Sequence, residues 1–586
     1  MPYAAPLADM RLTIEAVAAL DGEAAELVGP VLDEAARFAA SELDPLNQPA
    51  DRTGSVLENG VVRTPAGFRD AYRRYVEGGW MGLAVAPEHG GQGLPAALAT
   101  PVVEMLNSAC MSWALCPLLS AGAIDMLAAH GSPEQKRLYL AKLVSGEWTG
   151  TMNLTEPQAG SDLGALRTRA VPQRDARWGE HYRITGQKIF ITYGDHDLTD
   201  NIIHMVLART PDAPSGSRGI SLFLVPKFLP DIEGRPRERN DLRPLRLEEK
   251  LGIHASPTCV MSYGENEGAI GWRIGDENRG LEAMFTMMNS ERLGVGVQGV
   301  AIAERAYQQA RDYARTRVQG MPVGTPRGAA KGGESVPPII HHPDVRRMLL
   351  SMRAATEAMR ALAYFGAATI DASRNSENDQ AQFRAQRRAD LLIPVVKAWC
   401  TDLGVEVAST GIQVHGGMGY IEETGAAQYL RDARIAPIYE GTNGIQANDL
   451  VGRKLGRDRG EAARELISEM RASLAELGAP DLSAFHQPLT EGIDALDTAT
   501  AYLVAAEPAL AAAGSVPYLQ LCGTVLGGWL MARVGSAALR HQDRSIATAK
   551  LATARFYAEH VLARAPAYLP GIMGGATVVD FDPELL

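Results

Sequence analysis

Hydrophobic positions recur at helical spacing in two long regions of the chain and form shorter runs between them. In the first region, apolar residues at every third or fourth position predict helices over residues 68–82 and 119–143. Gly131-Ser132-Pro133 interrupts the second pattern and predicts a turn followed by a new helix start. We therefore expect the chain from about residue 30 to residue 150 to be helical.

The spacing changes between about residues 150 and 275. Short β-branched runs, such as Ile202 to Leu207 and Ile220 to Val225, are bounded by Pro, Gly and Asp clusters and predict strands. This part is expected to form a compact β-domain. The charged stretch from Asp231 to Arg246 is expected to be an exposed loop between strands, with its arginines on a solvated face.

Helical spacing returns from Gly280 to about residue 455, with long amphipathic patterns over 284–313, 345–370 and 385–410. The stretch from Gly320 to Pro338 is rich in Gly and Pro and is expected to be a mobile insertion. Beyond residue 457 the chain is alanine-rich and reads as further helices, with breaks near Gly478-Ala479-Pro480 and Gly514-Ser515-Val516-Pro517.

These patterns predict a mainly α protein with a central β-domain. A chain of 586 residues exceeds the usual size of one hydrophobic core, so several structural units are expected. We expect four domains: a helical domain, the β-domain, a helical bundle and a C-terminal helical domain, at residues 1–150, 151–278, 279–456 and 457–586.

Composition narrows the classes of function. Hydrophobic residues make up 46% and charged residues 22%, which is typical of soluble globular proteins. The net charge of −12 argues against a surface that binds nucleic acid, because phosphate contacts need clustered Lys and Arg. The five cysteines are scattered without a C-x-x-C pair, which argues against a disulfide framework or a zinc site and fits a reducing cytoplasm.

The sequence also argues against a membrane segment. The first 20 residues carry Asp9, Arg11 and Glu15 and lack the uninterrupted apolar core of a signal peptide. The apolar stretch from Ser515 to Met531 is short for a bilayer span and contains Gln520. Because it is rich in glycine, we expect it to be a closely packed helix of a bundle.

The segment from Ile438 to Gln446 has the most informative chemistry. Glu440 follows an apolar Ile-Tyr pair, and apolar neighbours raise the pKa of a carboxyl group towards neutrality, where it can accept a proton. The following Gly441-Thr442-Asn443-Gly444 lets a ligand approach the backbone and offers hydroxyl and amide donors. The same pattern is also typical of a helix boundary.

This segment resembles the catalytic-base motif of acyl-CoA dehydrogenases. Four further segments resemble motifs of that family, in the family's order: Leu154 to Asp162, Gly186 to Thr192, Lys250-Leu251-Gly252 with Ser256-Pro257-Thr258, and Gln413 to Gly419. The resemblance covers about residues 30 to 455 and implies the family's helical, β-barrel-like and bundle domains. The region beyond residue 457 resembles that of the longer bacterial subgroup with an added helical C-terminal domain, which includes 3-methylmercaptopropionyl-CoA dehydrogenases.

The resemblance implies a flavoprotein that converts an acyl-CoA thioester to the trans-2-enoyl-CoA. Glu440 would remove the α-proton and FAD would take the β-hydride, because protein side chains include bases but no hydride acceptor. No G-x-G-x-x-G lies between a strand and a helix, so an NAD site is not supported. Gly416-Gly417-Met418-Gly419 could approach a pyrophosphate, or could simply be the C-cap and turn after a helix.

The other site residues are implied by the family's motifs. Those expected at the flavin ring and the pyrophosphate are Met152, Leu154, Thr155, Ser161, Phe190, Thr192 and Thr442. Those expected to reach the ADP half of FAD across a subunit interface are Arg317, Gln319, Gln413, Gly416 and Gly417. Those expected at the substrate are Ser161, Arg292 and Gly441.

Glu291 competes with Glu440 for the role of base. It stands where isovaleryl- and long-chain-type members of the family have their catalytic glutamate, but those members lack a carboxylate in the Tyr-Glu-Gly-Thr segment. This chain has both, and the fuller motif favours Glu440. Two carboxylates near one site would push their pKa values apart, and Arg292 could hold Glu291 ionised.

Three functions stay open on the same scaffold. The first is a dehydrogenase that passes electrons to an electron-transferring flavoprotein, and the second is an acyl-CoA oxidase. The third is a DNA-associated flavoprotein like the alkylation-response members, which would need a basic surface. We expect a cytoplasmic homodimer or larger homo-oligomer. The expected substrate is 3-methylmercaptopropionyl-CoA or a short or medium straight-chain acyl-CoA.

Overall fold

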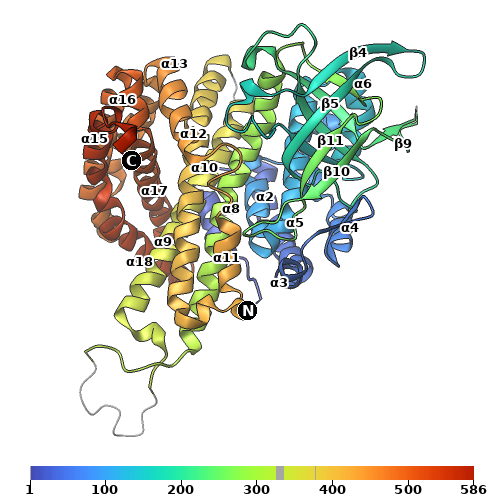
Figure 1. Cartoon of the computed structure of the whole chain (residues 1–586). Helices are drawn as coiled ribbons and strands as arrows, with labels where there is room; N and C mark the ends of the chain where they lie inside the picture. The colour runs from blue at the N-terminus through green and yellow to red at the C-terminus, as the bar shows by residue number, and fades with distance from the viewer. Residues whose placement is uncertain (1, 232, 325–335, 376–377, 586) are drawn as a thin grey trace. The chain divides into compact units, whose positions relative to one another are not determined.

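The computed structural model describes residues 2–231, 233–324, 336–375 and 378–585 (Figure 1). Contacts divide the chain into two compact units. The first, here called the β-unit, comprises Phe38–Leu94 and Ala109–Glu291. The second, here called the helical unit, comprises Met1–Arg37, Pro95–Ser108 and Arg292–Leu586.

The β-unit is built on an eight-stranded sheet. Its strands follow the order β10-β11-β5-β12-β7-β6-β3, and β4 pairs with β5. Only β3 and β6 are parallel among these pairs; the other described pairs are antiparallel. The two apolar runs predicted as strands are β6 and β7, and both are buried along their whole length. The bounds are β3 (Thr149–Asn153), β4 (Arg169–Asp175), β5 (Gly179–Thr192), β6 (Ile202–Ala208), β7 (Ser221–Pro226), β10 (Leu242–Leu247), β11 (Thr258–Tyr263) and β12 (Ala269–Ile274).

The prediction of a loop from Asp231 to Arg246 was wrong. This stretch contains β9 (Pro236–Arg239), which pairs with β8 (Phe228–Pro230), and the beginning of β10. In β10, Leu242 and Pro244 are buried while Arg243 between them is exposed. The many charges hid this two-residue alternation, which is typical of a strand with one buried face.

A second departure is a hairpin in the region predicted to be helical. Strand β1 (Val56–Glu58) pairs with β2 (Val61–Arg63) through Asn59 and Gly60, which both have positive φ. Asn-Gly is the residue pair that two-residue hairpin turns favour. The helices predicted around this hairpin are confirmed as α4 (Phe68–Glu77) and α5 (Ala96–His130).

Helix α5 ends where the turn was predicted. Ser132 caps the next helix through a capping box with Gln135, as the Gly-Ser-Pro sequence indicates. Among the described residues, α5 is the helix that is long and apolar enough to cross a membrane by length and composition. Within the protein, 83% of that apolar window is buried, as in the core helix of a folded domain.

The helical unit contains the three long helices predicted from the amphipathic patterns. They are α8 (Gly280–Thr316), whose first residues belong to the β-unit, α9 (Pro343–Asn375) and α10 (Asp379–His415). Helix α10 accommodates Pro394, as predicted. The central part of the predicted insertion, residues 325–335, lies outside the described residues.

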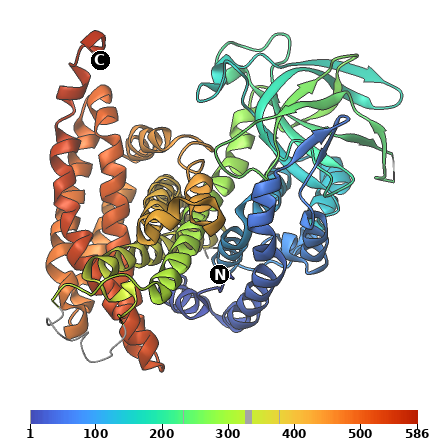
Figure 2. The same ribbon diagram turned by 60° about the horizontal axis from the view of Figure 1, so that its bottom comes forward.

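The C-terminal helices stand beside the bundle within the same unit. Helix α17 (Ser515–Arg540) packs against α9, α10 and α18 (Arg544–His560), and Figure 2 shows these orange-red helices next to the yellow ones. The glycines of α17 allow this close packing: a Cβ added to Gly523 would overlap the ring of Trp399. The prediction of a closely packed bundle helix is confirmed.

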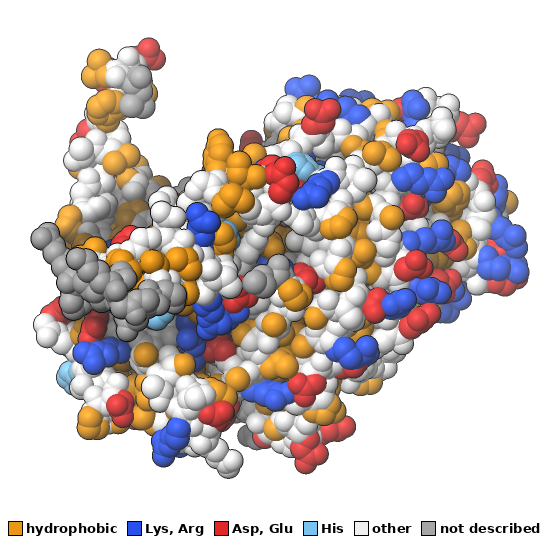
Figure 3. All heavy atoms as spheres, turned by 90° about the horizontal axis from the view of Figure 1, so that it is seen from below, with side chains coloured by type: hydrophobic (Ala, Val, Ile, Leu, Met, Phe, Trp, Pro, Cys, Tyr) orange, Lys and Arg blue, Asp and Glu red, His pale blue; other side chains and the backbone are white. Residues whose placement is uncertain are grey.

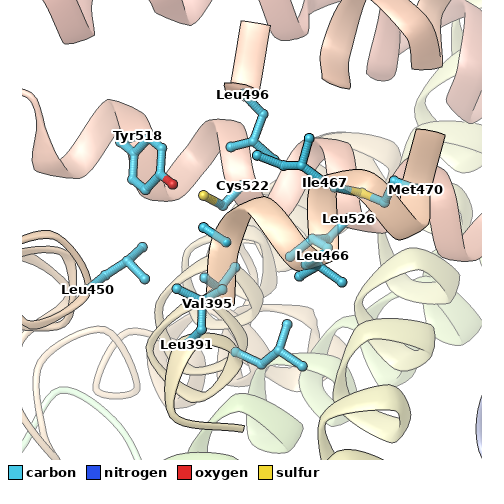
Figure 4. Close-up of a pocket in the computed structure, with 12 residues that line it drawn as sticks. Leu391, Val395, Leu450, Leu466, Ile467, Met470, Leu496, Tyr518, Cys522 and Leu526 are labelled. Atoms are coloured by element: carbon cyan, nitrogen blue, oxygen red, sulfur yellow. The ribbon is translucent and has the colours of Figure 1, made fainter. Parts of the chain in front are cut away.

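The C-terminal region shares an apolar core with α10. Figure 4 shows a pocket where α10 meets α14 (Glu461–Ser473), α15 (Ser483–Ala505) and α17. Tyr518 lies on the wall of this pocket, and its hydroxyl is hydrogen-bonded to Thr500 Oγ1 at 2.8 Å. The pocket is therefore part of the hydrophobic core. Its lining residues are Leu391, Leu392, Val395, Leu450, Ala463, Leu466, Ile467, Met470, Leu496, Tyr518, Cys522 and Leu526.

A cluster of buried charges also joins the helical unit. Arg360 on α9 is only 1% exposed and donates hydrogen bonds to Glu104 on α5 and Glu304 on α8. It also donates to Asp9 on α1 (Leu7–Val17). Asp9 in turn pairs with Lys550 on α18. The cluster therefore connects five helices that are far apart in the sequence.

Candidate active site

The predicted flavin-contacting loop follows β3 and is fixed by a buried ion pair. Lys188 on β5 is fully buried, and its ammonium donates to Leu154 O and to Glu156 Oε1, both at 2.9 Å. Burial alone would raise the pKa of Glu156, but Lys188 and hydrogen bonds from Thr168 and Arg167 lower it to about 2. The carboxylate is therefore ionised and holds the loop against β5.

Residues predicted to contact the flavin ring come together on this loop and the end of β5. The amide of Ile189 donates to Thr155 O at 2.9 Å, so the loop runs beside the strand. Phe190 is 60% exposed, while Thr155, Met152 and Thr192 are half-buried. An exposed aromatic ring beside two hydroxyl groups fits the flat flavin ring, which has an apolar face and polar edges. Ser161 is exposed in the turn that follows the loop.

Phe190 has an unusual backbone conformation. Its φ of 60° lies in the left-handed region, which bulky residues rarely adopt. The hydrogen bond between Ile189 and Thr155 and the pairing of Ile191 with Cys259 on β11 hold the strand on both sides of it. Strained residues held in this way concentrate at functional sites.

The residues predicted at the ADP half lie at the ends of two helices of the helical unit. Arg317 and Gln319 follow α8, whereas Gln413 and Gly416 end α10, and all four are exposed. The two helix ends meet, because the rings of Tyr313 and His415 lie 4.5 Å apart. Gly416, with φ 61°, caps α10, so the C-cap interpretation is confirmed; exposed Gly417 follows in a 3-10 turn.

Glu440 lies in a strained turn before α12 (Asn443–Asn448). Glu440 and Gly441 have successive positive φ values of 56° and 82°. Thr442 then caps the helix, with its hydroxyl accepting from the Ile445 amide at 3.3 Å. The helix-boundary interpretation is therefore correct as well. Glu440 is half-buried, and burial raises its pKa to about 7, with Arg292 and Lys397 acting in the opposite direction.

Two buried cations face this turn. The guanidinium of Arg292 lies 3.8 Å from the carboxylate of Asp449, and burial lowers the pKa of Arg292. The ammonium of Lys397, which is fully buried on α10, donates to Gly441 O and to Asn443 Oδ1, both at 2.8 Å. Burial lowers the pKa of Lys397 to about 7, although Glu440 and Asp402 act to raise it.

Sequence reasoning missed Lys397. The available signal was a single lysine within the apolar run Ile393-Pro394-Val395-Val396-Lys397-Ala398-Trp399 of a predicted helix. Lysine is almost never fully buried unless a partner satisfies it, so such a residue needs an explanation. In the structure its partners are the backbone and side chain of the turn that carries Glu440.

The competing carboxylate, Glu291, is on α8 in the β-unit. It is almost completely buried against α5, where a Cβ added to Gly122 would overlap its carboxylate. Arg292, the next residue, belongs to the helical unit together with Glu440 and Asp449. The charged groups that shift the pKa of Arg292 are Asp449, Glu440 and Arg453.

Family models match this fold and these motifs along nearly the whole chain. They are the N-terminal domain of acyl-CoA dehydrogenase at residues 30–147, its middle domain at 151–264 and its C-terminal domain at 278–326 and 330–455. A fourth, acetyl-CoA dehydrogenase C-terminal like, matches residues 466–582. The chain belongs to the acyl-CoA dehydrogenase family. It is an oxidoreductase that acts on acyl-CoA, and its cofactor is FAD.

Curated relatives refine the similarity within the family. The chain is 48% identical over 580 residues to 3-methylmercaptopropionyl-CoA dehydrogenase of Ruegeria pomeroyi, covering 96% of each. It is 35% identical to a butyryl-CoA dehydrogenase of Syntrophomonas wolfei, over 93% of this chain and 89% of the relative. It is 33% identical to the broad-specificity linear acyl-CoA dehydrogenase of Mycobacterium tuberculosis, over 91% and 89%.

Solved structures show the same fold, including the C-terminal helices. A Caenorhabditis elegans protein in complex with C11-CoA has a TM-score of 0.76 at 23% identity, covering 95% of this chain and 90% of that one. An acyl-CoA dehydrogenase from Bacillus anthracis complexed with FAD has a TM-score of 0.73 at 20% identity, covering 98% and 91%. The predicted fold class is confirmed.

Proposed function

We propose that Glu440 is the base that removes the α-proton of the acyl-CoA thioester. The observation that supports it best is the pKa of its half-buried carboxyl group, raised to about 7 in a turn that Lys397 holds in place. A base whose pKa lies near the working pH combines adequate basicity with a substantial ionised fraction. Bound FAD supplies the hydride acceptor that the side chains lack.

We assign the cofactor contacts to the residues predicted from the motifs. Leu154, Thr155, Phe190 and Thr192, with Met152, would face the flavin ring. The exposed ring of Phe190 and the half-buried hydroxyl groups of Thr155 and Thr192 support this. Ser161 would bind the pyrophosphate, and Thr442 would lie beside the flavin. Gly441 and Arg292 are proposed contacts of the substrate, as is Ser161.

The proposed substrate is a short or medium acyl-CoA, either straight-chain or with a thioether as in 3-methylmercaptopropionyl-CoA. The names of the relatives from Ruegeria, Syntrophomonas and Mycobacterium support this range. A thioether sulfur and a methylene are nearly isosteric, and an apolar pocket separates neighbours by only about 10- to 200-fold. We therefore expect overlapping activities, measured as kcat/KM over a panel of acyl-CoA esters. Activity confined to branched or aromatic acyl groups would contradict the proposal.

An electron-transferring flavoprotein is the proposed electron acceptor. A solved structure described as the electron-transferring flavoprotein of Acidaminococcus fermentans is similar to this chain, with a TM-score of 0.60 at 26% identity, covering 75% of this chain and 99% of that one. An oxidase would instead form peroxide with each turnover, which a peroxidase-coupled assay detects. A DNA-associated function is disfavoured by the net charge of −12, and Figure 3 shows Lys and Arg interspersed with Asp and Glu on the face it presents.

We further propose a cytoplasmic homodimer or larger homo-oligomer with the four domains 1–150, 151–278, 279–456 and 457–586. The five cysteines are scattered along the sequence and all are buried, which supports a reducing compartment. The exposed ends of α8 and α10, which carry Arg317 and Gln413, support an interface across which FAD is shared. Light scattering is expected to show at least a dimer. A monomer that keeps its FAD on dilution would exclude this arrangement.

Two substitutions test the assignment of the base. Glu440→Gln should retain FAD and bind acyl-CoA but reduce the flavin about 100- to 10,000-fold more slowly, because general-base catalysis is lost. Single-turnover stopped-flow absorbance measures this step directly. Glu291→Gln is the matched variant. If Glu291→Gln is inactive while Glu440→Gln keeps the parent's rate of flavin reduction, Glu291 is the base.

A further inference from the structure

A chain of hydrogen bonds connects α17 of the C-terminal region to the turn that carries Glu440. Gln520 on α17 donates from Nε2 to Asp402 Oδ2 at 2.8 Å. The other oxygen of Asp402 accepts from Asn443 Nδ2 at 2.6 Å. Asn443 Oδ1 in turn accepts from Lys397, which also donates to Gly441 O. All five residues belong to the helical unit.

The four side chains of this relay all belong to helices. Lys397 and Asp402 are on α10, Asn443 is the first residue of α12, and Gln520 lies on the buried part of α17. Asn443 has further fixed contacts, since its amide also donates to Ala398 O at 3.1 Å. The relay therefore ends on the carbonyl of Gly441, the residue next to Glu440 in a turn with two successive positive φ values.

We propose that Gln520 is a positioning residue for the catalytic base, and that it orients Asp402 so that Asn443 and Lys397 fix the turn carrying Glu440. This gives the added C-terminal region a role in the reaction, and it rests on the proposed function of Glu440. Within this relay, α17 acts on the turn indirectly, through residues of α10 and α12.

The relay is electrostatic as well as geometric. Lys397 lowers the pKa of Glu440, and Asp402 acts to raise the pKa of Lys397. Burial raises the pKa of Asp402, while the hydrogen bonds from Asn443 and Gln520 lower it. Removing the Gln520 amide should therefore favour protonation of Asp402, weaken the charge on Lys397 and raise the pKa of Glu440.

Other charged groups face these residues and must be unchanged in the comparison. Arg292, from α8, also lowers the pKa of Glu440 and is itself paired with Asp449. Arg434 acts on Asp402 from the segment after α11 (Ala426–Ala433), and Glu406 lies one turn further along α10. None of these groups is altered by a substitution at Gln520.

Gln520→Leu in the FAD-loaded enzyme is the principal test. We expect the rate of flavin reduction by butyryl-CoA to fall roughly 5- to 20-fold, because the base is less well placed, with little change in KM. We also expect the midpoint of the rate against pH to rise by roughly half a unit, since a neutralised Asp402 and a weaker Lys397 charge raise the pKa of Glu440. Stopped-flow absorbance between pH 5.5 and pH 9, in buffers of matched ionic strength, measures both effects.

Ser515→Ala is the matched control on the same helix. The hydroxyl of Ser515 donates to Asn448 Oδ1 at 3.0 Å, so the variant removes one hydrogen bond between α17 and α12 without touching the relay. A purely structural role of α17 predicts similar kinetics for both variants. The relay predicts a shifted pH midpoint for Gln520→Leu and an unshifted one for Ser515→Ala.

Asp402→Asn is the second variant, used if Gln520→Leu loses FAD or melts early. It removes the charge at the centre of the relay, and the pH midpoint should again rise. The proposal is wrong if Gln520→Leu has an unshifted pH midpoint and an unchanged rate of flavin reduction. The same result in Asp402→Asn has the same meaning where Gln520→Leu cannot be used. The Glu440→Gln variant separates the two proposals: if it stays fast, the assignment of the base fails whatever Gln520 does.

Discussion

At the scale of single residues, backbone strain coincides with the chemistry predicted from the motifs. Phe190 and Glu440, the proposed flavin contact and the proposed base, are both non-glycine residues with positive φ. Such conformations cost about 1–3 kcal/mol each and persist only where the surroundings enforce them. The pairing of β5 enforces the first, and Lys397 together with the cap of α12 enforces the second.

The raised pKa of Glu440 predicts that its carboxyl group reduces the stability of the protein at alkaline pH. Its pKa is about 7 in the folded protein against an ordinary value of 4.5, so the folded state binds the proton more tightly than the unfolded state. Glu440 therefore does not lower the free energy of unfolding below about pH 4. Its destabilising effect grows as the pH rises to about 7. We expect Glu440→Gln to be about 1–3 kcal/mol more stable than the parent at pH 8. The advantage should vanish near pH 4.

Urea denaturation of both proteins at the two pH values measures this difference. The control is Glu180→Gln on β5, whose side chain is 82% exposed and should change stability little at either pH. Equal stability of Glu440→Gln and the parent at pH 8 would show that the carboxyl group of Glu440 is not forced towards its neutral form by folding.

At the scale of elements, the loop proposed to contact the flavin is held by a buried ion pair. Lys188 and Glu156 are both buried, and they join the loop after β3 to the interior of β5. A buried charge left without its partner is strongly destabilising, by about 3–5 kcal/mol. The loop that carries Thr155 and Ser161 should then leave its place on the sheet.

We therefore expect Glu156→Gln to lose FAD readily, because Lys188 is left with a neutral partner. The measurement is the FAD retained after gel filtration, taken as the ratio of the visible flavin absorbance to the protein absorbance. Glu180→Gln on the same strand β5 serves again as the exposed control. Full FAD retention by Glu156→Gln, with an unchanged melting temperature, would contradict the role of the pair.

Close packing of α17 on α10 makes a second prediction at this scale. A Cβ at Gly523 would overlap the rigid ring of Trp399, so Gly523→Ala should destabilise the protein by about 1–3 kcal/mol. Gly456→Ala is the control, because its helical backbone has open space around it and alanine is the better helix former. Thermal unfolding should separate the two variants. An unchanged melting temperature for Gly523→Ala would mean that α10 and α17 can move apart with little loss of stability.

At the scale of the whole chain, buried charges join helices from its two ends. Asp9 near the beginning and Lys550 near the end meet Arg360 and Glu357 of α9 inside the helical unit. The C-terminal helices are thereby tied into the same unit as the bundle. This arrangement predicts that the bundle and the C-terminal region unfold together.

Arg360→Met tests this connection. It leaves Glu104 and Glu304 without their principal cation, and we expect a loss of about 3–5 kcal/mol. Arg347→Met on the same helix removes an exposed pair with Asp344 and should cost less than about 1 kcal/mol. Chemical denaturation followed by both tryptophan fluorescence and circular dichroism measures the losses. Similar small losses for the two variants would show that the cluster does not bind the helices together.

Much of the architecture could be read from local sequence. The long helices α8, α9 and α10 and the strands β6 and β7 were predicted because their hydrophobic spacing is a property of neighbouring residues. The motifs around Thr155 and Glu440 indicated the cofactor and the base for the same reason. Strand β10 was missed, since the charges on its exposed face hid the buried positions Leu242 and Pro244, and β9 has no buried residue that could have signalled a strand.

Only the tertiary structure decided which distant residues act together. Nothing in the spacing of Lys397, Asn443 and Gln520 shows that they join through Asp402, because burial and contact between helices are set by packing across the whole unit. The pKa of Glu440 is of this kind too: its apolar neighbours in sequence gave the direction, and desolvation with Arg292 and Lys397 nearby sets the value. Sequence thus determined the elements and the type of chemistry, whereas folding determined the environment in which the chemistry occurs.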